Sequence, residues 1–89
     1  MPQRQLQIIN KLGLHARAAT KLASLAGRFS SEIKVEVNGK TTDAKSIMSL
    51  MLLAAAQGTD ICVSADGEDE VTALDAIESL INDYFGEGE

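Results

Sequence analysis

Apolar and polar residues alternate in three segments of the chain, which predicts three strands with one buried face each. The segments cover residues 3–9, 32–37 and 60–65. The pair Asn38-Gly39, directly after the second segment, is typical of a two-residue hairpin turn. A return strand is therefore expected over residues 40–43, which brings the predicted total to four strands.

Other segments repeat their apolar residues every three or four positions, which predicts amphipathic helices. The first helix begins at Ala16. Its predicted buried face carries Ala18, Leu22, Leu25 and Phe29, and its opposite face carries Arg17, Lys21, Ser24 and Arg28. The pattern indicates a helix with one apolar face and one basic stripe.

Ser46 is placed to cap a second helix that runs to about Gln57, with Gly58 positioned to end it. The interior of this segment is apolar nearly all round. If the core side consists of Leu50, Leu53 and Ala54, then Met48 and Leu52 lie on the far side and Met51 on the flank. A contact partner should cover those exposed residues.

Asp66-Gly67 predicts a turn into a last helix, followed by a frayed tail over residues 86–89. This helix is expected to bury Val71, Leu74, Ile77, Leu80, Ile81 and Tyr84. The element order is βαββαβα. The simplest way to bury the core faces of these elements is to lay all three helices on one face of a four-stranded antiparallel sheet, so we predict a two-layer α+β sandwich.

Composition excludes several classes of protein. The 89 residues, 45% of them apolar, suffice for one core and a single domain over residues 1–89. A lone cysteine, Cys62, and a lone histidine supply neither an intramolecular disulfide nor four zinc ligands, and no metal or cofactor is expected. No segment approaches the roughly 20 apolar residues of a membrane span, and the N-terminus has no apolar signal core. We expect a soluble, cytoplasmic monomer.

The net charge of −5 conceals a division between two halves of the chain. Residues 1–45 hold all eight basic side chains and carry +5, whereas residues 46–89 carry −10. Such asymmetry permits a basic surface for acidic proteins or phosphate on an acidic molecule. The acidic balance and the three aromatic residues argue against nucleic acid as a partner.

His15, the lone histidine, stands where a loop enters the first predicted helix. The amides of Ala16 and Arg17 have no intrahelical acceptor there, and the positive end of the helix dipole favours an anion and a neutral, nucleophilic imidazole. The Arg17 guanidinium can bind a phosphate with two parallel hydrogen bonds. Together these groups could accept and hold a phosphoryl group. A lone loop histidine can equally be an ordinary polar surface residue.

The segment Gly13-Leu14-His15-Ala16-Arg17-Ala18-Ala19 resembles the active-site segment of the HPr-type phosphocarriers of the bacterial phosphotransferase system. A second segment, Ala44-Lys45-Ser46-Ile47-Met48 followed by Leu50, resembles the regulatory-serine segment of the same family. The resemblance implies an open-faced β-sandwich. It also implies that His15 receives phosphate on Nδ1 from phosphoenolpyruvate by way of enzyme I and passes it to an EIIA-type acceptor, as a stoichiometric carrier rather than an enzyme.

One position departs from the family pattern, since Ala18 stands where proline is common. Alanine keeps the helix but constrains its start less, so slightly altered transfer kinetics are expected. The approach Asn10-Lys11-Leu12-Gly13 and the acidic second half are similar to the nitrogen-branch (NPr) members.

Ser46 has two interpretations: a structural helix cap, or a site of regulatory phosphorylation by an ATP-dependent serine kinase with a matching phosphorylase. The methionines likewise are either core filler or part of a contact site. The resemblance and the exposed apolar positions together predict a partner interface at Arg17, Lys21, Lys45, Ile47, Met48, Met51 and Leu52.

Three alternatives come from other functional classes. A regulatory module of the same fold could signal through its phosphorylation state, although the presence of His15 argues against a version based on Ser46 alone. An acyl carrier is also small and acidic, but it is all-helical and carries its serine in an Asp-Ser-Leu context, whereas Ser46 follows Lys45. A small hydrolase lacks support because no Gly-x-Ser-x-Gly or Cys-His motif is present.

Overall fold

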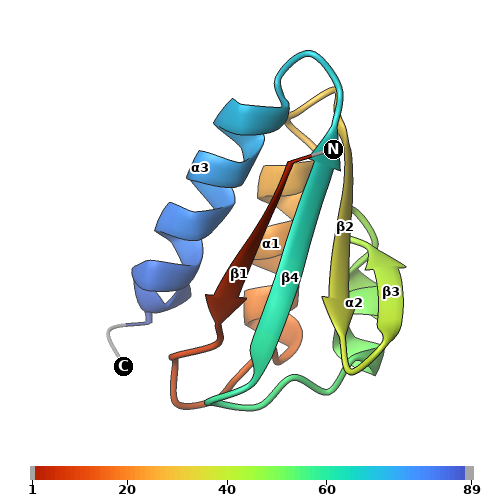
Figure 1. Cartoon of the computed structure of the whole chain (residues 1–89). Coiled ribbons are helices and arrows are strands. Elements are labelled where there is room, and N and C mark those ends of the chain that lie inside the picture. Colours follow the sequence, from red (N-terminus) through yellow and green to blue (C-terminus); the bar gives the residue numbers. More distant parts are fainter. Residues whose placement is uncertain (1, 88–89) are drawn as a thin grey trace.

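The computed structural model describes residues 2–87, which form a four-stranded antiparallel sheet with helices packed against one face (Figure 1). The strands are β1 (Gln3–Gln7), β2 (Glu32–Val37), β3 (Lys40–Asp43) and β4 (Asp60–Asp66). The helices are α1 (Ala16–Ala26), α2 (Ile47–Leu52) and α3 (Glu70–Asn82), and a short 3-10 helix, η1 (Tyr84–Gly86), follows α3. The predicted βαββαβα order and open-faced sandwich are confirmed.

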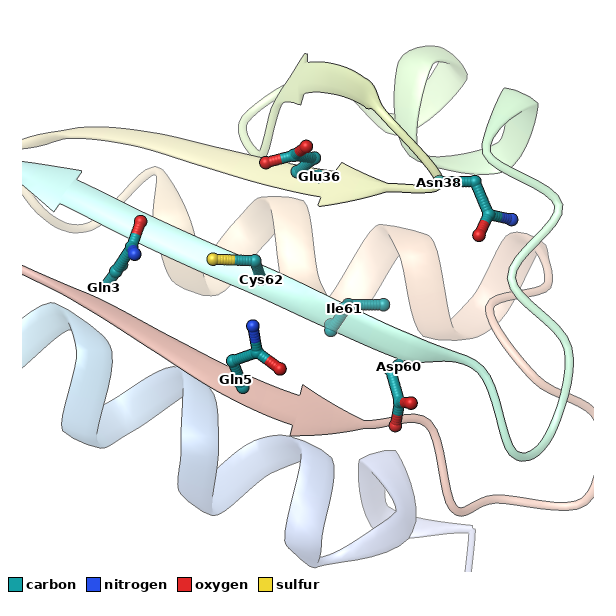
Figure 2. Close-up of a pocket in the computed structure, with 7 residues that line it drawn as sticks. All are labelled: Gln3, Gln5, Glu36, Asn38, Asp60, Ile61 and Cys62. Carbon is teal, nitrogen blue, oxygen red and sulfur yellow. The ribbon is translucent and has the colours of Figure 1, made fainter.

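The strands lie in the order β1-β4-β2-β3, so the two central strands carry the middle of the core. Val35 on β2 pairs with Val63 on β4, and both side chains are fully buried beneath the helices. The opposite face of the sheet is polar. Figure 2 shows Gln5, Cys62 and Glu36 in neighbouring positions there, on a hollow of about 290 Å³. Period-two patterning therefore separates an apolar inner face from a polar open face.

The hairpin between β2 and β3 forms as predicted at Asn38-Gly39. Both residues take positive φ, 51° and 83° respectively, as the mirror-image turns that join twisted strands require. The first strand ends at Gln7, two residues earlier than predicted, although Ile8 still exchanges hydrogen bonds with Gly58 and Thr59.

The buried face of α1 is built largely from alanine. Its buried residues are Ala18, Ala19, Leu22, Ala23 and Ala26. Small side chains let this helix approach its neighbours closely, and α1 contacts both α2 and α3. The helix ends at Ala26, so Phe29 packs against the core from the following loop rather than from the helix face.

The last helix differs from its prediction at both ends. Val71 is 55% exposed and Tyr84 is 38% exposed, whereas both were expected to be buried. The helical period stops at Asn82, and Tyr84 and Phe85 take left-handed φ values of 57° and 54°. This turn directs the Phe85 side chain into the core, where it is fully buried, and leaves Tyr84 outside.

Helix α2 is shorter than predicted, since it ends at Leu52 and not near Gln57. Ala54 takes a left-handed φ of 53° and is exposed, so it terminates the helix instead of entering the core. The chain beyond it is held by a tertiary contact, because the amide of Leu14 donates to the Ala55 carbonyl at 2.8 Å. That hydrogen bond ties the Ala55 carbonyl to the loop that precedes α1, whereas a continued helix would direct this carbonyl along its own axis.

Residues 2–87 contain neither a membrane-spanning helix nor a cluster of metal ligands. None of their helices has the length and apolarity that crossing a membrane requires. In the same range, no three His, Cys, Asp or Glu side chains gather in a way that could hold a metal ion.

Candidate functional site

His15 lies at the start of α1, as predicted, and acts as its N-terminal capping residue. Its backbone is extended, with φ −80° and ψ −178°, and its carbonyl accepts the first helical hydrogen bond from Ala19 at 2.8 Å. The imidazole does not cap the helix. Its side chain is 29% exposed and can be approached from solvent, while the first-turn amides of Ala16 and Arg17 have no acceptor within the helix.

The loop that delivers His15 is fixed on both sides. Asn10 Nδ2 donates to the Gly13 carbonyl at 2.8 Å, and the Gly13 amide donates back to the Asn10 carbonyl at 3.1 Å. Gly13 has a φ of +70°, and a Cβ at this position would lie 2.6 Å from the Ala55 carbonyl oxygen. Only glycine fits this close backbone approach, so the loop is locked two residues before the imidazole.

Glu87 is the partner of His15 that the sequence did not indicate. One carboxylate oxygen, Oε2, is in hydrogen-bond contact with His15 Nε2, and the other, Oε1, accepts from Asn10 Nδ2 at 2.9 Å. The Glu87 side chain is only 9% exposed. The chain thus returns 72 residues later to close the site from the opposite side.

The charge state of Glu87 determines which nitrogen of His15 carries the proton. Burial of the carboxylate opposes its ionisation, but the hydrogen bonds from Asn10 and His15, with the charges of His15 and Lys21, lower the pKa of Glu87 below its usual value. An ionised carboxylate only accepts hydrogen bonds, so Nε2 must be the donor. In the neutral imidazole, Nδ1 then carries the free lone pair that a nucleophile needs.

The chain around Glu87 is ordered by specific contacts. Lys21 Nζ donates to the Phe85 carbonyl at 2.6 Å, and the Gly86 amide donates to the Asp83 carbonyl at 2.9 Å. A frayed tail was expected over residues 86–89, and this stays a prediction, although Gly86 and Glu87 make the hydrogen bonds given above. Gly88 and Glu89 lie outside the described residues.

Arg17 lies beside the paired His15 and Glu87. Its exposed side chain lines a pocket of about 310 Å³ together with Leu12, Gly86 and Glu87. A guanidinium in this position could pair with an incoming phosphate. Phosphate binding by Arg17 and by the first-turn amides stays a prediction.

Helix α2 exposes the apolar side chains that the sequence placed away from the core. Leu50 is fully buried, whereas Ile47, Met48, Met51 and Leu52 are 40%, 69%, 40% and 76% exposed. We call these four residues the α2 apolar patch. Only one residue of this six-residue helix, Leu50, is buried in the core, so the other apolar side chains are left exposed.

Two of the three predicted interface cations also have structural contacts. Lys21 holds the Phe85 carbonyl, as described above, and Lys45 Nζ donates to the Phe29 carbonyl at 2.9 Å. The predicted cap of α2 is confirmed, because the Ser49 amide donates to Ser46 Oγ at 3.3 Å. Ser46 itself is half-buried.

The sequence of this chain is similar to one family of known proteins. Residues 2–83 match a family model described as the PTS HPr component phosphorylation site. The chain is 55% identical to the phosphocarrier protein HPr of Cupriavidus necator and 53% identical to that of Neisseria meningitidis serogroup A, over 100% of each chain. It is 46% identical to the phosphocarrier protein NPr of Shewanella violacea, over 96% of this chain and 93% of the relative.

Solved structures agree with the fold. A crystal structure of HPr-C-His from Thermoanaerobacter tengcongensis superimposes with a TM-score of 0.94 at 45% identity, covering 98% of each chain. A crystal structure of an HPr dimer from the same organism gives a TM-score of 0.79 at 45% identity, covering 98% of this chain and 100% of the other.

Proposed function

This chain belongs to the PTS HPr family, and on that premise we propose that His15 accepts a phosphoryl group from phosphorylated enzyme I and passes it to an EIIA-type acceptor. Phosphoenolpyruvate is the ultimate donor in this proposal, and the chain is a stoichiometric carrier that works in the cytoplasm. The observation that carries it is the contact between Glu87 and His15 Nε2, because it leaves Nδ1 as the nucleophile.

The proposed transfer follows from the charges around the ring. The Nδ1 lone pair attacks phosphorus, a P–N bond forms, and the bond to the donor's group breaks with its electron pair. Positive charge then develops on the imidazole, and the carboxylate of Glu87 stabilises it through the proton on Nε2. In this proposal, Arg17 and the first-turn amides of α1 bind the phosphoryl oxygens. Transfer back out reverses these steps.

The direct test is incubation of the full chain with purified enzyme I and labelled phosphoenolpyruvate, comparing the parent with His15→Ala. We expect one acid-labile phosphoryl group per parent chain by intact mass and none on the variant. Label that persists in His15→Ala would overturn the proposal. Adding EIIA-type acceptors of the sugar and nitrogen branches to the labelled parent then identifies the branch from the acceptor that removes the label faster.

The α2 apolar patch is the proposed contact surface for both partners, with a basic rim from Arg17, Lys21 and Lys45. Leu52 is 76% exposed, so Leu52→Ser should leave the fold intact while raising the KM for transfer from enzyme I. Val71→Ser is the matched control, because Val71 is an exposed apolar residue on a different helix, α3. Equal KM values for the two variants would exclude the patch.

Regulation through Ser46 is the second part of the proposal. A phosphate there would put about two negative charges next to the α2 apolar patch and weaken contact with acidic partners. Ser46→Asp and Ser46→Asn both keep a good capping residue, but only the first adds charge. We expect slower acceptance from enzyme I for Ser46→Asp than for Ser46→Asn, and equal rates would remove charge as the mechanism.

We also propose that the carrier works as a monomer, since transient partners must reach the α2 apolar patch. A related HPr has been crystallised as a dimer, so the mass in solution needs to be measured. Light scattering at the concentrations used for transfer should give 9.5 kDa, and a mass of twice that value would refute the proposal.

A further inference from the structure

We propose that Asn10 is a positioning residue for this phosphoryl transfer: it holds the Glu87 carboxylate against His15 and thereby fixes the proton of the imidazole on Nε2. The inference rests on the proposed function for its purpose, but the contacts that support it are independent of any partner. Asn10 follows β1 and precedes the loop that leads to His15.

Asn10 is one of two fully buried polar residues in the described chain, and its side chain is not fully satisfied. Both protons of its Nδ2 group are used, one on the Gly13 carbonyl at 2.8 Å and one on Glu87 Oε1 at 2.9 Å. Its Oδ1 is buried and has no hydrogen-bond partner among the described residues. An unpaired buried carbonyl destabilises the fold, so an amide here serves the two contacts of Nδ2 and does not improve packing.

Those two contacts join the two sides of the site. The Gly13 carbonyl belongs to the loop that presents His15, and Glu87 belongs to the segment after η1. A single rigid amide thus sets the distance between the imidazole and its carboxylate. No other hydrogen bond between side chains links Glu87 to the body of the protein, apart from that to His15 itself, within residues 2–87.

The carboxylate uses its two oxygens on different partners. With Oε1 bound to Asn10, the plane of the group is fixed and Oε2 faces His15 Nε2. The groups near Glu87 that carry or can carry positive charge are the titratable ring of His15, the Lys21 ammonium and the Arg17 guanidinium, which lines the same pocket as Glu87. Without Asn10, the carboxylate could rotate toward either cation, and the ring could place its proton on Nδ1. That tautomer has its lone pair on Nε2, which faces Glu87, and none on Nδ1, the nitrogen proposed to accept phosphate.

The test reads the tautomer of the unphosphorylated full chain directly, from the ¹⁵N chemical shifts of the His15 ring, in the parent, Asn10→Ala, Glu87→Ala and the double variant. We expect Asn10→Ala to lose part of the Nε2-protonated tautomer and to accept phosphate from enzyme I more slowly in proportion. In the Glu87→Ala background, Asn10→Ala should change neither quantity further, because the two residues act in one chain of contacts.

A parent-like tautomer in Asn10→Ala would overturn the inference, and so would losses that multiply in the double variant. Asn10→Leu keeps about the size of the side chain, removes the Nδ2 donors and adds no charge beside Glu87, so it serves as a second variant where Asn10→Ala fails to fold. It should show the same loss. The chemical shifts are measured without enzyme I, so the two proposals can fail separately. A parent that accepts no phosphate would contradict the proposed function, whereas the tautomer populations alone would show whether Asn10 positions the His15 proton.

Discussion

Replacing Gly13 by alanine would place a methyl group where the backbone after α2 already lies. The new Cβ would be 2.6 Å from the Ala55 carbonyl oxygen and 2.9 Å from the Ala56 Cα. Both atoms belong to the main chain, so neither can move aside as the end of a flexible side chain could. The loop that carries His15 and the segment after α2 must therefore separate.

The loss of stability has two parts. An L-residue at a φ of +70° costs about 1–2 kcal/mol. Separating the segments also weakens the hydrogen bond from the Leu14 amide to the Ala55 carbonyl, now 2.8 Å, which contributes about 0.5–1.5 kcal/mol. We therefore expect Gly13→Ala to lower the free energy of unfolding by about 2–3 kcal/mol, or the Tm by roughly 10–20 °C in a domain of this size.

Gly39→Ala is the matched control, since Gly39 has a φ of +83° and no atom within 4 Å of the added Cβ. It carries the backbone cost without the close approach. Urea unfolding of both variants should show the larger loss for Gly13→Ala. Its phosphoryl acceptance per folded molecule should also be slower, because His15 is two residues away. Equal losses in the two variants, with equal transfer rates, would refute the reasoning.

Three further predictions concern other parts of the fold. Ala54→Gly should raise the free energy of unfolding by about 0.5–1 kcal/mol, since it removes the cost of a φ of 53°, whereas Ala76→Gly inside α3 should lower it by about 1 kcal/mol. Changes of the same sign for both variants in urea unfolding would contradict this prediction. Leu50→Ala should cost about 2–5 kcal/mol by the same measurement, because Leu50 is the fully buried residue of α2. Asp69 accepts hydrogen bonds from the side chain and amide of Ser31, and these lower the pKa of its carboxyl below 3.8. The contribution of Asp69 to the free energy of unfolding is therefore complete above pH 3.8 and is lost as the pH falls through the lowered pKa. Asp69→Asn should be less stable than the parent at pH 7 and should lose less stability between pH 5 and pH 2.

The strands were predictable because each has one buried face, and the period of two is visible in residues 32–37 and 60–65. The hairpin at Asn38-Gly39 and the cap at Ser46 are local features with local signals. The length of α2 was not predictable in this way. Residues 53–56 continue an apolar, alanine-rich pattern, yet Ala54 takes a left-handed φ and the Ala55 carbonyl accepts from the Leu14 amide, a contact across 41 positions of the chain.

Half of the candidate site follows from the sequence and half does not. His15 could be placed because a histidine at a predicted helix start has a chemical meaning on its own. Glu87 could not, since a carboxylate near the end of an acidic helix is indistinguishable from a solvated tail. A weak signal was available in Phe85, because a large apolar residue just after the last helical turn needs a place in the core, and burying it brings Glu87 toward His15.

The division of charge along the chain acquires a different meaning in the folded protein. In the sequence, a basic half and an acidic half suggest two separate surfaces, yet several of the charges pair across the fold. Arg4 on β1 lies 2.6 Å from Asp75 and 2.8 Å from Glu78 on α3, and the hydrogen bond with Asp75 is the main reason why the pKa of Arg4 is raised.

Contacts across the fold also determine which charges an arriving phosphoryl group would meet at His15. The nearest carboxylate, Glu87, is already occupied by Asn10 and by the Nε2 proton of His15, and Lys21 lies close enough to lower its pKa. Its negative charge is therefore compensated before the anion arrives, and the exposed guanidinium of Arg17 faces the same pocket. An acidic protein can in this way present a site suited to phosphate, because the carboxylate in contact with His15 orients the ring and its charge is compensated, so it would not repel the phosphoryl group that the ring is proposed to receive.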